Sequence, residues 1–358
     1  MANIFDYTKW RGDLSLKQSE FNEIDNLILS RFAYFPFDNI IKEKEVITIR
    51  ELGKRFKNTN SNNMHILQKE DIELFPLIAE SKRFGDMIAT QYINKVDSEQ
   101  EKQFSAITII MPDDTLYVSY RGTDNTIVGW KEDFNMSFKN HVASQIDSVK
   151  YLEMIAKTYK KGKLRVGGHS KGGNLAVYAS VFASEKVKKR IVNVYNNDGP
   201  GFSNEITETQ EYKNTINKVN TFVPQSSVVG RLLNHEEKHT IVESTQKGIM
   251  QHDLYSWQLL GNKFIYLDAL TNESEFVDKT INEWLENVDP KQREQVIDII
   301  FEILNTTDAE TLAGLKEKWY VNAKVIMQSY KNVDEENKKM ISQTINSLLK
   351  IVKNNIFK

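Results

Sequence analysis

Cysteine is absent from this sequence of 358 residues. A chain without thiols forms no disulfide, no thiolate-bound zinc or iron–sulfur site and no cysteine nucleophile. Any catalysis must therefore use hydroxyl groups, imidazoles, carboxylates or a metal bound without sulfur. The chain has six histidines, and one of them is the expected general base.

A surplus of charge of either sign is also missing. The 47 lysines and arginines nearly cancel the 49 aspartates and glutamates, and no long basic block could hold nucleic acid. Eighteen consecutive apolar residues occur nowhere, and Asp6 stands where a secretory signal needs a basic stretch before an apolar one. We therefore expect a cytoplasmic protein with no transmembrane segment and no nucleic-acid partner. The sequence carries no signal for an oligomeric state.

The order of apolar segments predicts the fold class. Hydrophobic residues make up 40% of the chain, which is enough for a large core. Strands that alternate with helices predict a mostly parallel sheet with right-handed crossovers. We expect an α/β domain over residues 1–270, with an N-terminal elaboration over 1–63, and a C-terminal helical extension over 271–358. The predicted strands span residues 87–96, 104–111, 115–120, 164–166, 191–195 and 219–223, with helices at 142–159 and 175–182.

Glycine is sparse but clustered, and the cluster marks a candidate site. Seven of the sixteen glycines lie between positions 162 and 201, where residues 168–172 read Gly-His-Ser-Lys-Gly between an apolar strand and an apolar helix. In a nucleophile elbow the serine occupies a strained strand-to-helix turn, and flanking glycines avoid collisions. The pattern predicts Ser170 as a nucleophile between Gly168 and Gly172, with the backbone N–H of Lys171 as an oxyanion donor. The alternative is an unrelated glycine-rich turn, for example one that binds phosphate.

Two motifs carry a resemblance to a known group of enzymes. Residues 168–176, Gly-His-Ser-Lys-Gly-Gly-Asn-Leu-Ala, and residues 119–124, Ser-Tyr-Arg-Gly-Thr-Asp, together resemble the class 3 (fungal-type) lipases. The chain is more closely similar to a largely uncharacterised family of bacterial lipase-like α/β-hydrolases, whose members also begin with a segment like residues 6–13, Asp-Tyr-Thr-Lys-Trp-Arg-Gly-Asp. The resemblance covers roughly residues 1–270. It implies the α/β-hydrolase fold and a serine nucleophile, but no particular ester.

The turn after the strand at 115–120 is the second part of the predicted site. The resemblance implies that Thr123 supplies the second oxyanion donor. This turn should also lie at the carboxyl edge of the sheet, near the elbow. Arg121 and Asp124 either contribute to the site or brace the loop.

The general base is expected downstream of Ser170, because the α/β-hydrolase triad runs serine, acid, histidine along the chain. Three histidines follow, His235, His239 and His252. His252 lies in a loop after the last core strand, where the resembling family places its histidine, and we predict it as the base. His169 adjoins Ser170, but the sharp turn directs neighbouring side chains apart, so we expect it to pack.

The acid is where this chain departs from the lipase pattern. Class 3 lipases carry an aspartate after the strand that corresponds to residues 219–223, but residues 224–230 here read Pro-Gln-Ser-Ser-Val-Val-Gly. Asp198 is the only aspartate between Ser170 and His252. Asp198 follows the strand 191–195 after two asparagines. It should therefore lie at the same edge of the sheet as Ser170, and we predict it as the acid. It could instead be a turn aspartate that caps backbone N–H groups. The alternatives to Asp198 in the role of the acid are Ser226, Ser227 or a glutamate such as Glu236.

A metal-dependent alternative comes from residues 235–239. They read His-Glu-Glu-Lys-His, the H-E-x-x-H pattern that on a helix holds zinc with a glutamate as general base. Residues 240–243 are strand-like, so a helix would have to end at the second ligand, and no third ligand is signalled. A zinc metalloprotease is therefore a remote alternative, and we predict no metal and no organic cofactor.

These features lead to two main hypotheses. The first is a serine acyl-hydrolase, lipase-like or esterase-like, that cleaves a small-molecule or lipid ester through an acyl-enzyme. The second is a hydrolase-like scaffold that has lost catalysis and serves as a binding or regulatory protein. The missing acid at the usual position motivates the second.

Overall fold

The computed structural model describes residues 2–59, 64, 66–124, 126–307 and 319–356. The chain divides into two compact units. The first comprises Met1–Lys95, Phe104–Gly122 and Ser144–Thr271, and the second comprises Val96–Gln103, Thr123–Ala143 and Asn272–Lys358. The second unit thus takes two short segments from within residues 1–270 as well as the C-terminal helices. A domain boundary at residue 270 stays a prediction.

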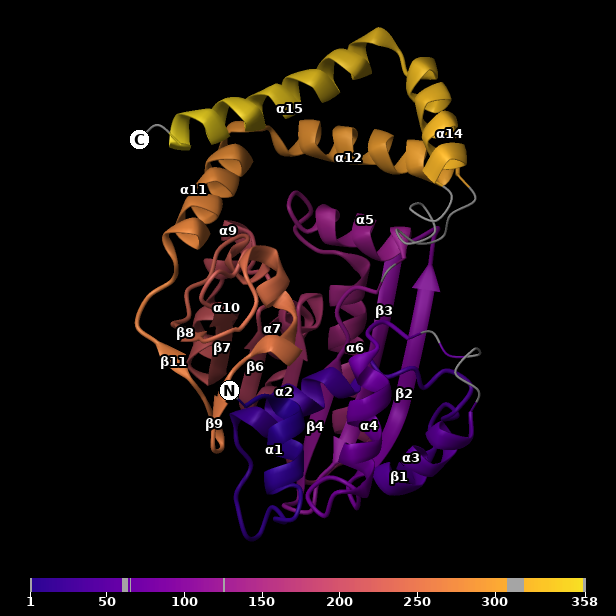
Figure 1. The fold of residues 1–358 in the computed structure, drawn as a ribbon, viewed down its shortest axis with the longest axis vertical. Coiled ribbons are helices and arrows are strands. Elements are labelled where there is room, and N and C mark those ends of the chain that lie inside the picture. The colour runs from indigo at the N-terminus through magenta and orange to yellow at the C-terminus, as the bar shows by residue number, and fades with distance from the viewer. Residues whose placement is uncertain (1, 60–63, 65, 125, 308–318, 357–358) are drawn as a thin grey trace. The chain divides into compact units, whose positions relative to one another are not determined.

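A mostly parallel sheet forms the centre of the first unit (Figure 1). In the described part of the chain it has nine strands in the order β1-β2-β3-β4-β5-β6-β7-β8-β11. Strands β4 to β8 pair in parallel, whereas β1–β2, β3–β4 and β8–β11 pair antiparallel. The strands are β1 (Val46–Thr48), β2 (Ile88–Asp97), β3 (Lys102–Ile110), β4 (Thr115–Tyr120), β5 (Lys163–His169), β6 (Ile191–Asn197), β7 (Val219–Pro224), β8 (His239–Val242) and β11 (Tyr266–Leu267). A separate antiparallel ribbon joins β9 (Leu259–Leu260) to β10 (Lys263–Phe264).

Helices cover both faces of this sheet. Strand β4 accordingly alternates its side chains between two hydrophobic cores, one on each face. Tyr117 belongs to one core, and Leu116 and Val118 belong to the other. The first core lies under α1 (Ile4–Arg11), α2 (Glu23–Phe32), α3 (Ile49–Asn58) and α4 (Glu70–Glu80). The second lies under α6 (Ala143–Thr158), α7 (Lys171–Phe182), α8 (Glu185–Lys188), α9 (Asn204–Thr207) and α10 (Gln210–Thr215). The N-terminal elaboration is therefore one layer of the fold, and the predicted α/β class is confirmed.

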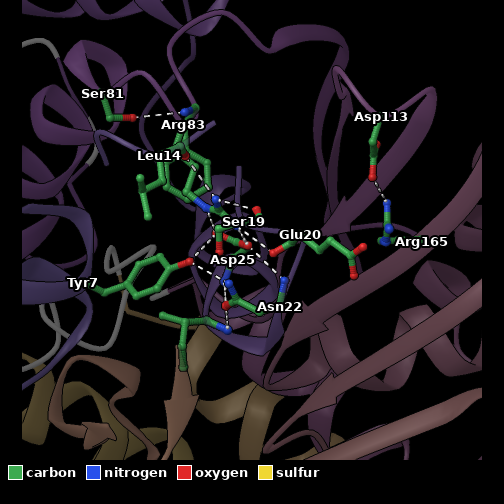
Figure 2. A network of polar contacts seen from close by, with 12 residues as sticks. Tyr7, Leu14, Ser19, Glu20, Asn22, Asp25, Ser81, Arg83, Asp113 and Arg165 are labelled. Atoms are coloured by element: carbon green, nitrogen blue, oxygen red, sulfur yellow. Dashed lines mark hydrogen bonds and ion pairs between the residues drawn. The ribbon is translucent and has the colours of Figure 1, made fainter. Parts of the chain in front are cut away.

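A buried ion pair fixes this N-terminal layer. The side chains of Arg83 and Asp25 are both fully buried, and Arg83 Nε donates to Asp25 Oδ1 at 2.5 Å (Figure 2). Tyr7 of α1 donates to the same carboxylate at 2.9 Å. The remaining guanidinium donors bind the backbone carbonyls of Leu14, Ser19 and Glu20 (Figure 2). Because the charge is paired and its donors are engaged, its burial is tolerated.

The second unit is helical in its C-terminal part. A small core of Val296, Ile299, Ile303 and Ile341 joins two of its helices. Its helices are α5 (Ile127–Asn135), α11 (Asn272–Asn287), α12 (Pro290–Asn305), α14 (Trp319–Asn332) and α15 (Glu335–Ile356). Among the described residues, no helix is both long enough and apolar enough to cross a membrane.

Candidate active site

The strand-to-helix turn at Ser170 has the geometry of a nucleophile elbow. Strand β5 ends at His169 and helix α7 begins at Lys171, so Ser170 is the single residue between them. Its backbone has φ of 59° and ψ of −137°, a combination that costs energy for a residue with a side chain. Such strain is what the elbow needs in order to project the serine hydroxyl away from the sheet.

The two glycines beside Ser170 are required by close backbone contacts. A Cβ atom on Gly168 would lie 2.3 Å from the carbonyl group of Gly172. A Cβ atom on Gly172 would lie 2.2 Å from the carbonyl oxygen of Tyr120. These neighbours are backbone atoms of packed elements and cannot easily move. The turn therefore closes only with glycine at both positions.

Asp198 and His252 lie within hydrogen-bond distance of each other. Asp198 directly follows β6 and its side chain is fully buried. The Nδ1 atom of His252, at the end of the 3₁₀ turn Gly248–His252, lies 2.7 Å from Oδ2 of Asp198. A carboxylate only accepts, so the neutral imidazole donates from Nδ1 and leaves Nε2 as an acceptor. This is the tautomer that a base needs in order to take a proton from serine. The His252 side chain is 25% exposed.

Ser227 completes the surroundings of Asp198, a role that the sequence did not reveal. Its hydroxyl donates to Oδ1 of Asp198 at 2.5 Å and accepts the N–H of Gly230 at 3.1 Å. A Cβ atom on Gly230 would lie only 2.2 Å from Asp198 Oδ1, so this neighbour must also be small. Ser227 is thus a donor to the candidate acid rather than a replacement for it. Of the other proposed alternatives, Ser226 instead bonds to Thr271, with 2.8 Å between the two hydroxyl oxygens.

His169 connects the elbow to the histidine loop. Its Nε2 atom lies 2.8 Å from the carbonyl oxygen of His252, and the two imidazole rings are 4.5 Å apart. Burial lowers the pKa of His169 well below its usual range, and positive charge on His252 or Arg31 would lower it further. His169 is therefore neutral and packs, as expected from the turn. Because Ser170 follows it directly, the candidate nucleophile and the candidate base come from segments that meet at one sheet edge.

The predicted oxyanion donors lie on two segments. Lys171 is the first residue of α7, where backbone N–H groups and the helix dipole favour an anion. Thr123 belongs to the second unit, in which its hydroxyl donates to Asp133. Because that hydroxyl already donates to Asp133, the donor that Thr123 would offer to an oxyanion is its backbone N–H. This role stays a prediction.

The two charged residues that flank Thr123 make bracing contacts. Arg121 donates to Asn94 Oδ1 at 2.9 Å. Asp124 accepts the backbone N–H of Thr126 at 2.9 Å, at the residue that caps α5. Each contact supports the expectation that these side chains hold their segments in place.

The H-E-x-x-H segment does not form the helix that a zinc protease uses. Its last residue, His239, begins strand β8. Residues 235–238 lie outside any helix or strand, and the three residues that gather here are His235, Glu237 and His239, with ligand atoms within 4.8 Å of one another. Glu236 is exposed instead.

The hydrogen bonds of this cluster oppose metal binding. Glu237 accepts from His235 Nδ1 at 3.0 Å and from Thr221 at 2.7 Å. Arg231 donates to His239 Nδ1 at 2.9 Å. A guanidinium cannot accept, so neutral His239 carries its proton on Nε2 and offers no lone pair there to a cation. The geometry therefore gives the zinc alternative no support.

Comparison with known proteins identifies the family of this chain. The model of the Mbeg1-like family matches residues 78–302, more than half of the chain. No curated protein matches the chain significantly.

Similar solved structures include three fungal lipases. For the Rhizomucor miehei lipase–propeptide complex the identity is 14%, the match covers 50% of this chain and 70% of that chain, and the TM-score is 0.37. Lipase II from Rhizopus niveus is 15% identical, and the match covers 63% of this chain and 91% of that chain with a TM-score of 0.37. The lipase from Rhizopus microsporus var. chinensis is 15% identical, and the match covers 66% of this chain and 87% of that chain with a TM-score of 0.35.

The mostly parallel sheet, covered by helices on both faces and carrying a strand–serine–helix turn, defines a lipase-like α/β-hydrolase fold. Within this class the chain belongs to the Mbeg1-like family.

Proposed function

We propose that this protein is a serine acyl-hydrolase that cleaves a carboxylic ester of a small molecule or lipid in the cytoplasm. The observation that supports it most is the 2.7 Å contact between His252 Nδ1 and the buried Asp198. That contact sits on segments adjoining the strained elbow of Ser170. The tautomer it selects is the one that general-base catalysis requires.

The proposed reaction runs in two halves. His252 Nε2 takes the proton of the Ser170 hydroxyl while Oγ attacks the ester carbonyl, and the N–H groups of Lys171 and Thr123 bind the oxyanion. The tetrahedral intermediate then expels the alcohol, which receives its proton from His252. A water molecule, deprotonated by His252, attacks the acyl-enzyme, releases the carboxylic acid and restores Ser170. These steps need no metal and no organic cofactor.

The binding or regulatory alternative does not require an acid beside the histidine, whereas the enzyme does. Here Asp198 is buried beside His252 and receives a second hydrogen bond from Ser227. This arrangement favours the enzyme.

The test is labelling with a fluorophosphonate probe together with hydrolysis of short p-nitrophenyl esters. Ser170→Ala should abolish both, because the probe forms its covalent bond with the activated oxygen. Ser226→Ala is the control, since Ser226 is another serine hydroxyl of this unit and bonds to Thr271. Equal labelling of wild type and Ser170→Ala would overturn the proposal. A wild-type protein that neither labels nor turns over would favour the binding or regulatory role.

A further inference from the structure

Tyr34 reaches the candidate active site from the N-terminal layer. It follows α2 by two positions and is buried. The guanidinium of Arg31 lies 4.5 Å above its ring, and Arg31 is held by Asp71 through bonds of 2.7 and 2.6 Å. The ring is therefore fixed on one side by a buried ion pair, which leaves its hydroxyl with a defined position.

The Tyr34 hydroxyl joins two segments of the site. It accepts the backbone N–H of Gly122 at 2.9 Å and donates to the backbone carbonyl of His169 at 2.9 Å. Gly122 is the last residue of the first unit's segment Phe104–Gly122, and the next peptide bond carries the N–H of Thr123 that is proposed as an oxyanion donor. His169 immediately precedes Ser170. A Cβ atom on Gly122 would lie 2.2 Å from this hydroxyl and 3.0 Å from Ser170 Cβ, so the three groups are closely packed.

The His169 side chain extends the same connection to the base. A carbonyl oxygen only accepts, so the 2.8 Å contact with His252 places the proton of His169 on Nε2. The bonds therefore run from Gly122 to Tyr34, from Tyr34 to the backbone of His169, and from the His169 ring to the backbone of His252.

We propose that Tyr34 and His169 are positioning residues for acyl transfer, forming a hydrogen-bonded brace that sets the oxyanion turn, the nucleophile and the base relative to one another. This inference rests on the proposed function. Tyr34 lies outside residues 78–302, the part matched by the family model. The N-terminal layer thus contributes to the site itself as well as to the core.

The brace is tested by comparing Tyr34→Phe with Tyr7→Phe. Both tyrosines are buried in the N-terminal layer, and each hydroxyl accepts one hydrogen bond and donates another. The partners of Tyr7 are Asn22 and Asp25, in the network of Figure 2. Both variants keep the ring, and Tyr34→Phe also keeps the stack on Arg31. Tyr7→Phe loses a bond to a buried carboxylate and should cost at least as much stability as Tyr34→Phe, so a larger loss of activity in Tyr34→Phe would reflect what its hydroxyl positions.

Tyr34→Phe should lower kcat by about 10- to 100-fold with little change in KM, because small displacements of reacting groups have effects of this size. Fluorophosphonate labelling of Ser170 should reach completion but at a correspondingly lower rate. Tyr7→Phe should leave both rates unchanged. Hydrogen exchange gives a readout that does not depend on turnover: the Gly122 amide should exchange faster in Tyr34→Phe and at the wild-type rate in Tyr7→Phe.

His169 is tested by a conservative pair. His169→Gln retains an N–H donor on a side chain of similar reach and should keep a larger share of kcat than His169→Phe, which has none. Equal kcat values for the two would overturn the role of the His169 donor.

The outcomes separate this inference from the proposed function. Normal labelling of wild type with equal kcat losses in Tyr34→Phe and Tyr7→Phe would overturn the brace and leave the serine hydrolase intact. Unchanged exchange of the Gly122 amide in Tyr34→Phe would also overturn it. A wild type that does not label would overturn the hydrolase and, with it, any role of Tyr34 in catalysis.

Discussion

Replacement of Asp198 by asparagine tests whether the tautomer of His252 carries the activity. The carboxylate accepts from His252 Nδ1 at 2.7 Å and from the Ser227 hydroxyl at 2.5 Å. An amide has one oxygen, so one of these two donors must face an NH₂ group. Ser227 accepts the Gly230 N–H at 3.1 Å, which directs its own proton toward residue 198 and lets it retain the amide oxygen. The NH₂ group then faces His252.

An NH₂ group opposite Nδ1 selects the wrong imidazole tautomer. Nε2 then carries the proton and cannot accept one from Ser170. Loss of the correct tautomer in a serine–histidine–aspartate triad lowers kcat about 10⁴-fold, which corresponds to a rise of about 5.4 kcal/mol in the activation barrier. The melting temperature should change little, because asparagine has the shape and volume of aspartate. Ester hydrolysis and calorimetry on the same preparation measure the two effects.

The double variant Asp198→Asn/Ser227→Ala sharpens this test. Without the Ser227 hydroxyl the amide can rotate, present its oxygen to His252 and restore the Nδ1–H tautomer, so the double variant should be more active than Asp198→Asn alone. Ser227→Ala by itself is the control and should lose much less activity than Asp198→Asn. A kcat for Asp198→Asn close to wild type would refute the acid assignment. Equal activity of the single and double variants would refute the rotation while leaving the acid in place.

Three further predictions concern the elbow, pH and the N-terminal layer. Gly172→Ala, whose Cβ would lie 2.2 Å from the Tyr120 carbonyl oxygen, should abolish probe labelling and destabilise the protein by about 1–3 kcal/mol, as denaturant titration would show; wild-type stability and labelling would contradict the packing argument. Burial lowers the pKa of His239 to about 3, so the unfolded chain binds a proton there that the native state does not. This proton uptake does not affect the free energy of unfolding above about pH 6.5, and it lowers that free energy by about 1.4 kcal/mol per pH unit as the pH falls toward the folded pKa. Urea titrations between neutral and acid pH should show a shallower decline of the free energy of unfolding for His239→Gln. Identical declines in the two proteins would argue against a lowered pKa of His239. Arg83→Met leaves Asp25 buried without its ion-pair partner and should lower the free energy of unfolding by about 3–5 kcal/mol; a loss below about 1 kcal/mol would show that the network carries little stability.

The elbow geometry at Ser170 and the position of Asp198 at a strand end could be predicted from the sequence because their requirements are local. A serine at positive φ between closely approached glycines leaves a pattern five residues long, and an aspartate at a strand end is visible beside its strand. Ser227, in its observed role as a donor to Asp198, and Tyr34 could not be found in this way. Their partners lie 29 and 88 positions away in the chain, and the fold alone brings them together.

The H-E-x-x-H segment shows how a spacing argument depends on secondary structure. On a helix, residues four apart share a face, and Glu236 would be the candidate base. The backbone here is irregular over residues 235–238, with a bend at Glu237, and then enters β8, so the helical spacing does not apply. Glu237 joins His235 and His239, and Glu236 faces solvent. The β-branched residues after His239 were the local indication that a strand begins there.

The position of Asp198, the candidate acid, also bears on whether the site can be active. In the class 3 pattern the aspartate follows the strand equivalent to β7, whereas here Ser227 lies in that segment and donates to Asp198 after β6. Strands β6 and β7 are parallel neighbours that end at one sheet edge, and the Asp198 N–H bonds to the Phe222 carbonyl of β7 at 2.8 Å. A carboxylate can therefore reach the same histidine from either strand end. What catalysis requires is an acceptor at His252 Nδ1, so the serine in the usual acid segment does not by itself argue for a lost activity.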